Sequence, residues 1–290
     1  MKRPLETDGY DENDDEKEIS GGIVASVIPD EFLEKHSSEF HKACRHIMRI
    51  DKSLVEIILK GDFPLFLKDK REVDFQFYYD KLASAIISQQ ISGIAAKSIK
   101  KRLIDYFGGK FPAFGELHDE LVDPIKRQKV QACGFSARKM EYLESLTNYF
   151  CEKENSIKDL FANGTDDEIV EQLTKNIKGI GPWSSKMFLL TGLSRMDVFA
   201  PDDLGIARGF SKYLSDKPLL VEELKRNRVA AKRSKIKHKK LNWVIYDDDL
   251  MEKFAAQFSP YRSVLMFILW RMAATNVEAM ANNEKEFISN

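Results

Sequence analysis

Two neighbouring acids, Asp202 and Asp203, are the residues of this 290-residue sequence that are best placed to do chemistry. They follow Pro201 and stand directly before a predicted helix that starts at Leu204. A carboxylate at this place can cap the helix and interact favourably with its dipole. It can also stabilise positive charge on a sugar as the base departs, or activate a water molecule. At this point both roles stay open.

A glycine-rich turn precedes the two acids by about 20 residues. The segment KGIGPW at 178–183 lies within a predicted helical hairpin that spans residues 166–193. Gly179 and Gly181 suit a tight turn, and Pro182 suits the first turn of a helix. Backbone N–H groups at that helix start have no intrahelical partner and make a site for a phosphate. Such a hairpin holds a DNA backbone without reading bases, and a plain turn between two helices is the alternative.

The elements that must position these residues are helices. Apolar residues recur at helical spacing over most of the chain, and no alternating run longer than five residues predicts a strand. The predicted helices cover residues 31–50, a short stretch after the N-cap Asp51, 78–88, 94–107, 124–132, 137–152, 166–176, 182–193, 204–214 and 249–274. Within the last one, residues 264–270 are all apolar, so this helix must be buried. The sequence therefore predicts an all-α fold.

The composition excludes several classes of protein. With 43% hydrophobic and 31% charged residues, the chain has material for a sizeable core in one large domain or two small ones. No apolar run approaches the roughly 20 residues that a membrane span needs. The N-terminus has no apolar stretch after its first charges, so we expect an intracellular protein. The three cysteines are scattered and predict neither a structural zinc site nor an iron–sulfur cluster.

The net charge of −1 results from cancellation along the chain. Residues 225–240 contain nine Lys or Arg and no acid, whereas the first 20 residues contain eight acids and three bases. We predict that residues 1–25 are a disordered acidic tail and that residues 26–290 form the folded domain. The basic run belongs to an insertion at 225–247, for which nuclear targeting or nucleic-acid contact is slightly favoured over an inert loop.

Four motifs in order make the chain resemble a known family. They are AIISQQISGIAAKSI at 85–99, KGIGPW at 178–183, DVFAPDDLG at 197–205 and FSPYRSVLMFILWR at 258–271. This set resembles the helix-hairpin-helix glycosylases of base-excision DNA repair, and within them the fungal and bacterial DNA-3-methyladenine glycosylases of the alkylation-repair type. The resemblance covers roughly residues 30 to 280. It implies two helical subdomains with a DNA-binding cleft between them.

The resemblance also implies roles for individual residues. Asp203 matches the family's catalytic carboxylate, and Asp202 matches its helix-capping neighbour. A pocket for the flipped base would be formed by Trp183 and Trp270, with ordinary core packing as the alternative for each. Met187 would also line the pocket, and Phe199 would support it or simply pack in the core. Met187 stands where the bacterial relative has an aromatic residue, which leaves the pocket's shape open.

Further implied sites concern the DNA and a cation. Gln90 is the best candidate for the wedge that fills the gap in the duplex, with Gln89 and Ile91 as alternatives. The hairpin residues that would contact the DNA backbone are Lys178, Gly179, Ile180, Gly181 and Trp183. The family binds a structural monovalent cation through hairpin carbonyls, which by position are those of Lys175, Ile177 and Gly179. No other cofactor is implied.

The expected reaction is hydrolysis without strand cleavage. Relatives that also cut the strand carry a lysine where this chain has Trp183, because an amine must form a Schiff base with the sugar. Neither Lys178 nor Lys186 occupies that place. We therefore expect a monomeric, nuclear, monofunctional glycosylase that acts on alkylated purines in double-stranded DNA. A glycosylase for a deaminated or oxidised base and a noncatalytic DNA-binding module are the alternatives.

Overall fold

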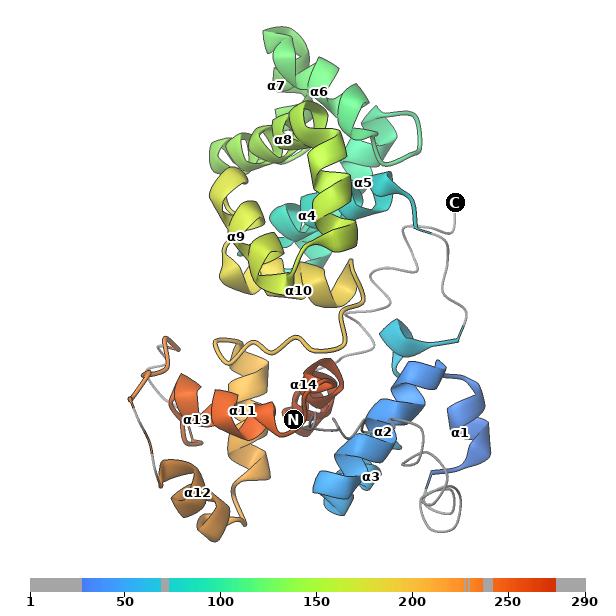
Figure 1. Cartoon of the computed structure of the whole chain (residues 1–290). Helices are drawn as coiled ribbons and strands as arrows, with labels where there is room; N and C mark the ends of the chain where they lie inside the picture. Colours follow the sequence, from blue (N-terminus) through green and yellow to red (C-terminus); the bar gives the residue numbers. More distant parts are fainter. Residues whose placement is uncertain (1–27, 69–72, 227, 229, 237–241, 275–290) are drawn as a thin grey trace, which may run out of the picture.

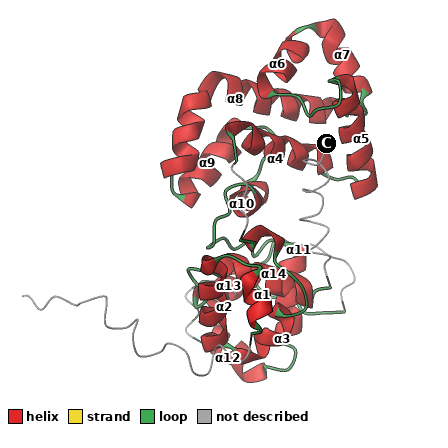
Figure 2. Ribbon diagram, turned by 90° about the vertical axis from the view of Figure 1, so that its right-hand side faces the viewer, coloured by secondary structure: helices red, strands yellow, loops and turns green. Residues whose placement is uncertain are grey.

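The computed structural model describes residues 28–68, 73–226, 228, 230–236 and 242–274. In this part of the chain all regular elements are helices, which confirms the predicted all-α fold. The helices form two lobes, drawn one above the other in Figure 1 and again in the turned view of Figure 2. No helix among these residues is both long and apolar enough to cross a membrane. The predicted acidic tail, residues 1–25, lies outside the described residues.

The upper lobe is a continuous stretch of the chain. Its helices are α4 (Phe75–Ser88), α5 (Gly93–Tyr106), α6 (Phe114–Val122), α7 (Pro124–Ala132), α8 (Ala137–Asn163), α9 (Asp166–Asn176) and α10 (Pro182–Thr191). The long helix α8 packs against α4, α6 and α9, and α10 packs against α9 and α4. Gly108 and Gly109, with φ of 74° and 100°, follow the end of α5 as predicted.

The lower lobe combines the two ends of the described chain. Its elements are α1 (Asp30–Glu34), α2 (Ser38–Ile50), η1 (Lys52–Leu54), α3 (Val55–Ile58), η2 (Pro64–Phe66), α11 (Leu204–Tyr213), α12 (Pro218–Lys225), α13 (Asp248–Ala256) and α14 (Arg262–Met272). Helix α14 contacts α11, α13, α2 and α3. All its side chains from Ser263 to Trp270 are buried, as the apolar run predicted.

Helices α11 and α14 pack with their backbones unusually close. A Cβ atom at Gly209 of α11 would overlap the backbone carbonyl oxygen of Leu269 in α14. A side chain at this position is therefore excluded by the neighbouring main chain, which cannot turn away as a flexible side chain can. The close approach fixes α11, and with it the residue that precedes it, against the C-terminal half of α14.

Two predicted helices are wrong because each is broken in the structure. The predicted helix 31–50 is split into α1 and α2, and the hydroxyl of Ser37 caps α2 by accepting from the N–H of Phe40. The predicted helix 249–274 is split into α13 and α14 around Pro260, which has no N–H to donate to a helix. The helices α6 and α12 were not predicted, and α8 continues to Asn163 through a non-helical residue, Lys153.

Candidate active site

Asp203 lies at the junction of the two lobes and accepts three hydrogen bonds. Its Oδ1 accepts from the backbone N–H of Ile206 at 2.9 Å, which makes Asp203 the N-cap of α11. The indole N–H of Trp270 donates to the same oxygen at 2.9 Å, and the indole N–H of Trp183 donates to Oδ2 at 3.0 Å. The side chain is almost buried, at 9% exposure. Both carboxylate oxygens are therefore held in fixed directions.

The predicted capping role of Asp202 is wrong. The helix starts at Leu204, so the residue directly before it is Asp203, and its extended backbone has the φ and ψ of an N-cap. The carboxylate of Asp203 is thus both the helix cap and the catalytic candidate. The sequence analysis had assigned capping to Asp202 and catalysis to Asp203. Asp202 is half-buried beside it.

The two indoles that hold Asp203 come from different lobes. Trp183 stands in the first turn of α10, is 42% exposed and is part of the upper lobe. Trp270 stands near the end of α14, is 2% exposed and packs edge-on against Phe267 with ring centroids 5.4 Å apart. Trp183 thus has ring surface free for a stacked base, whereas the contact that Trp270 makes here is with the carboxylate. The pocket role of Trp270 stays a prediction.

Met187 and Phe199, the other two predicted pocket residues, follow Trp183 in the chain. Met187 is half-buried on α10, one turn after Trp183. Phe199 is buried in the segment between α10 and α11, and its carbonyl accepts from the ammonium group of Lys186 at 2.9 Å. Lys186 therefore ties α10 to the segment that leads to Asp203.

That connecting segment is fixed by the first turn of α14. The guanidinium of Arg262 donates to both carboxylate oxygens of Asp197, at 2.7 and 2.9 Å. Burial alone raises the pKa of Asp197, but hydrogen bonds from Arg262 and Ser259 outweigh it and hold the pKa below its usual value. The hydroxyl of Ser263 donates to the carbonyl of Arg195 at 2.7 Å and accepts from the N–H of Val198 at 3.0 Å. One helix therefore holds this segment at its start and Asp203 at its end.

The helical hairpin forms as predicted, with α9 and α10 joined by the glycine turn. Thr165 and Glu168 form the predicted capping box at the start of α9. Gly179 has φ of 81°, and a Cβ there would overlap the ring of Tyr142. Gly181 is the N-cap of α10 and gives no side-chain hydrogen bond to that helix. The first N–H groups of α10 are thus uncapped by a side chain, as a phosphate site requires.

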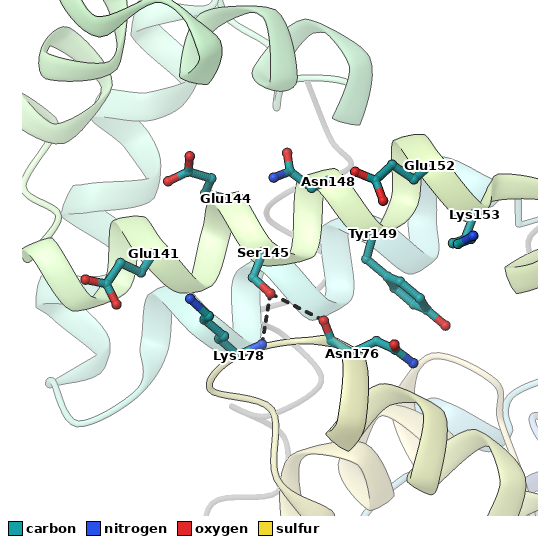
Figure 3. Close-up of a pocket in the computed structure, with 9 residues that line it drawn as sticks. All are labelled: Glu141, Glu144, Ser145, Asn148, Tyr149, Glu152, Lys153, Asn176 and Lys178. Carbon is teal, nitrogen blue, oxygen red and sulfur yellow. Dashed lines mark hydrogen bonds between the residues drawn. The ribbon is translucent and has the colours of Figure 1, made fainter.

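Ser145 of α8 holds the glycine turn in place, and the sequence did not predict this contact. The hydroxyl of Ser145 accepts from the N–H of Lys178 at 3.0 Å and donates to the carbonyl of Asn176 at 3.4 Å (Figure 3). Beside this brace is a polar hollow of about 510 Å³. It is lined by Glu141, Glu144, Ser145, Asn148, Tyr149, Glu152, Lys153, Asn176 and Lys178. Of the predicted backbone contacts, Lys178 and Gly179 are exposed, whereas the side chain of Ile180 is buried.

The loop of the predicted wedge lies against the hairpin. The amide of Gln89, the C-cap of α4, donates to the carbonyl of Gly179 at 2.8 Å. Gln90 has a positive φ of 57°, and Ile91 is 37% exposed. The hydroxyl of Ser92 then caps α5. Gln89 is thus engaged with the hairpin, which leaves Gln90 and Ile91 at the tip.

Two further residues of this region were missed or misread. Ile94 fits helical spacing and was counted among the apolar positions of its helix, yet it is 84% exposed in the first turn of α5. Like Ile91, it is an exposed apolar side chain of this region. Lys139 of α8 donates to the carbonyl of Ile87 at 2.5 Å, and burial lowers the pKa of this lysine. No sequence pattern signals such a contact between side chain and backbone.

The carbonyls predicted to bind a monovalent cation are partly engaged already. The carbonyl of Gly179 accepts from Gln89, and that of Ile177 accepts from the N–H of Ile180 at 3.2 Å. A carbonyl oxygen has two lone pairs, so each can still take a ligand, and the cation site stays a prediction. The described residues contain no cluster of three His, Cys, Asp or Glu side chains that could hold a metal ion.

The described part of the basic insertion is partly neutralised. Arg228 donates to the carboxylates of Asp247 and Asp249 at 2.5 to 2.7 Å, and Lys232 donates to Glu252 at 2.8 Å. These two cations form ion pairs with acids at the start of α13. Lys232 is nevertheless exposed, as are Lys225, Arg226, Arg233 and Lys235. Residues 237–241 lie outside the described part of the chain.

The comparisons with known proteins identify the family of the chain. The model of the HhH-GPD superfamily of base excision DNA repair proteins matches residues 83–231, which include the wedge loop, the hairpin and Asp203. The chain belongs to this family. Its relatives within the HhH-GPD superfamily include a DNA-3-methyladenine glycosylase of Saccharomyces cerevisiae, 53% identical over 94% of this chain and 93% of the relative. DNA-3-methyladenine glycosylase 1 of Schizosaccharomyces pombe is 32% identical over 61% of this chain and 74% of the relative.

A solved structure of the superfamily supports the fold as well. The Schizosaccharomyces pombe 3-methyladenine DNA glycosylase in complex with abasic DNA is similar with a TM-score of 0.55 and 28% sequence identity. The match covers 79% of this chain and 95% of that one. The resemblance inferred from the four motifs is confirmed.

Proposed function

We propose that this chain is a monofunctional DNA glycosylase that removes alkylated purines, such as 3-methyladenine and 7-methylguanine, from double-stranded DNA. The observation that carries this proposal is the carboxylate of Asp203, held by one indole from each lobe at the lobe junction. The names of the Saccharomyces and Schizosaccharomyces relatives support the substrate class. The abasic DNA in the solved relative supports the expected product, which is an abasic site.

Binding begins at the DNA backbone. The uncapped N–H groups at the start of α10 and the exposed Lys178 suit a phosphate beside the lesion. The tip at Gln90 and Ile91 then fills the space that the damaged nucleotide leaves when it rotates out of the duplex. Unstacking costs a few kcal/mol and costs less at a lesion, which favours damaged nucleotides.

The lesion does most of the chemistry. Alkylation at N3 or N7 gives the purine a positive charge, so the base leaves as a neutral molecule when the C1′–N bond breaks. The electron-poor ring stacks favourably on Trp183 before it leaves. Positive charge then develops on the deoxyribose, and the fixed carboxylate of Asp203 stabilises it. Water adds to C1′ and gives up a proton, so the products are the free base and an abasic site.

Strand cleavage by a Schiff base is not expected. The place of the nucleophilic lysine in other relatives is taken by Trp183, whose indole donates to Asp203. Lys186, one turn further along α10, donates its ammonium protons to the carbonyl of Phe199. Neither residue offers a free amine to the sugar, so hydrolysis is the expected outcome. We further propose that the protein acts as a monomer and in the nucleus, where its substrate lies.

An excision assay on a panel of damaged duplexes tests the proposal. We expect release of 3-methyladenine and 7-methylguanine, and no strand cleavage without heat or alkali. Asp203→Asn keeps an oxygen that can cap α11 but removes the negative charge, so excision falls by at least about 100-fold while affinity for DNA is retained. If only deaminated or oxidised bases are released, the protein is a glycosylase for another class of lesion. A parental excision rate in Asp203→Asn, or no release of any base, contradicts the proposal.

A further inference from the structure

We infer that a second hollow, on the lower lobe, binds a nucleotide. This hollow has a volume of about 800 Å³ and lies between the C-terminal half of α11, α12, residues 242–246 and the end of α14. Its lining combines three cationic side chains with two aromatic rings: Arg208, Lys212, Lys225, Trp243 and Tyr246. Nothing in the proposed excision reaction uses these residues.

The cations of the hollow are available to a ligand. Arg208, Lys212 and Lys225 are all exposed, and none of them forms an ion pair with a carboxylate in the described part of the chain. The lining includes one acid, Glu222, so the positive charge is in excess. The neighbouring Arg228 differs, because it is paired with two aspartates. The hollow therefore attracts an anion with more than one negative charge.

The aromatic rings of the hollow are held in place and keep their polar atoms free. Tyr246 packs edge-on against Phe210 with ring centroids 5.4 Å apart. The hydroxyl of Ser211 accepts from the N–H of Val244 at 3.1 Å and so fixes the loop segment that carries the two rings. Trp243 and Tyr246 are half-buried. Within the described residues neither the indole N–H nor the phenol OH has a hydrogen-bond partner.

A nucleotide combines the two features that this lining recognises. Its base offers a flat ring that stacks on Trp243 or Tyr246, and base stacking on an aromatic side chain is favourable whatever the base. Its phosphates match clustered arginine and lysine side chains, which form charge-assisted hydrogen bonds with them. The volume lies within the usual range of ligand pockets, roughly 300–1,000 Å³. An acidic peptide matches the charges but not the paired rings. The nucleotide is either free or the unpaired end of a DNA strand.

The hollow is separate from the candidate active site. Along α11 the axial rise is about 1.5 Å per residue, so Arg208 lies about 7.5 Å and Lys212 about 13.5 Å beyond Asp203. Asp203, Trp183 and the hairpin do not line the hollow. Binding there is therefore measurable without excision.

The test measures binding of three probes to the full chain by calorimetry. ATP represents a free nucleotide, a 5′-phosphorylated single-stranded oligothymidylate represents a strand end, and hexaglutamate represents an acidic peptide. We expect ATP, the oligonucleotide or both to bind, and hexaglutamate to bind at least about tenfold more weakly. The double variant Arg208→Ala/Lys212→Ala lowers the affinity by about tenfold or more, since each charged contact contributes of order 1 kcal/mol.

Matched variants separate the hollow from general charge effects. Lys52→Ala/Lys60→Ala removes two exposed cations elsewhere on the lower lobe and leaves nucleotide binding unchanged. Trp243→Phe keeps a stacking ring and binds, whereas Trp243→Leu weakens binding. The inference is overturned if neither nucleotide probe binds, if hexaglutamate binds equally well, or if the hollow variants bind like the parent.

The outcome is independent of the proposed reaction. Asp203→Asn retains nucleotide binding in the hollow even though it loses excision. Arg208→Ala/Lys212→Ala retains the single-turnover excision rate at saturating damaged duplex. If the latter variant loses excision as well, the hollow is part of the lesion site and the inference of a separate site is wrong.

Discussion

The indole N–H of Trp270 donates to Oδ1 of Asp203 over 2.9 Å, and this bond joins the last turns of α14 to the start of α11. Trp183 supplies the corresponding bond to Oδ2 from the other lobe. The direction of the carboxylate thus depends on two helices that are far apart in the sequence.

Trp270→Phe tests this arrangement, because it keeps an aromatic ring and removes the donor. We expect the single-turnover excision rate to fall about tenfold, which corresponds to about 1.4 kcal/mol of transition-state stabilisation. The free energy of unfolding falls by about 1–2 kcal/mol. Phe267→Leu, which alters the ring packed against Trp270 but no bond to Asp203, is the control. A parental rate in Trp270→Phe contradicts a positioning role for the indole.

Gly205→Ala and Gly209→Ala separate the position of the indole from the packing of the helices. A Cβ at Gly205 would lie 2.7 Å from Cδ1 of Trp270, so we expect a displaced indole and slower excision. A Cβ at Gly209 would overlap the main chain of Leu269, so we expect a loss of about 3 kcal/mol in stability. Urea unfolding and single-turnover rates measure the two effects. Equal losses of stability in both variants would show that Gly205 serves packing alone.

Gln89→Ala tests the link between the wedge loop and the hairpin. The variant loses the bond to the carbonyl of Gly179 at an exposed site. We expect about 3- to 10-fold weaker binding of abasic duplex, from about 0.5–1.5 kcal/mol per hydrogen bond, and an unchanged unfolding midpoint. Ser88→Ala is the matched control, because its hydroxyl bonds only within α4. Unchanged affinity in the Gln89 variant, measured by fluorescence anisotropy, would count against the link.

We expect Asp80 to make the upper lobe less stable near neutral pH. Burial raises the pKa of this carboxyl to about 6, and a hydrogen bond from Gln76 offsets only part of that shift. Because the folded state binds the proton more tightly than the unfolded state, this group's contribution to stability declines as pH rises from about 4 to 6. At pH 7 Asp80→Asn should therefore be more stable by roughly 1–3 kcal/mol. Urea unfolding from pH 4 to 7 checks this, and a parental pH dependence in the variant would refute it.

The elements with strong local signals were predictable from the sequence. Thr165 with Glu168, and Pro182 after Gly181, mark the ends of the hairpin helices by capping and by restricted backbone, which are local properties. The breaks at Ser37 and Pro260 were overlooked, because apolar spacing continues across them. Helix α12 lies beside a basic run whose charge obscured its short apolar face.

Only those features of the candidate site that depend on a single residue and its local sequence were predictable. Asp203 follows from its place before a helix and from the family motif. That it also caps α11, and that two indoles hold it, depends on contacts between residues 20 and 67 positions apart. The braces by Ser145 and Lys139 involve backbone groups, which no sequence pattern records. Ile94 was misread because helical spacing does not say which face of a helix is covered.

Because α14 is buried on all sides, substitutions in it cannot change the stability of the fold without also affecting the candidate active site. Its first turn fixes the segment at Asp197, and its eighth buried residue in sequence holds Asp203. A substitution in this core that shifts the helix by a fraction of an ångström also moves the carboxylate relative to the sugar. Selection for a more robust fold and selection for faster repair therefore act on the same residues, and thermostabilising mutations should be sought outside this helix.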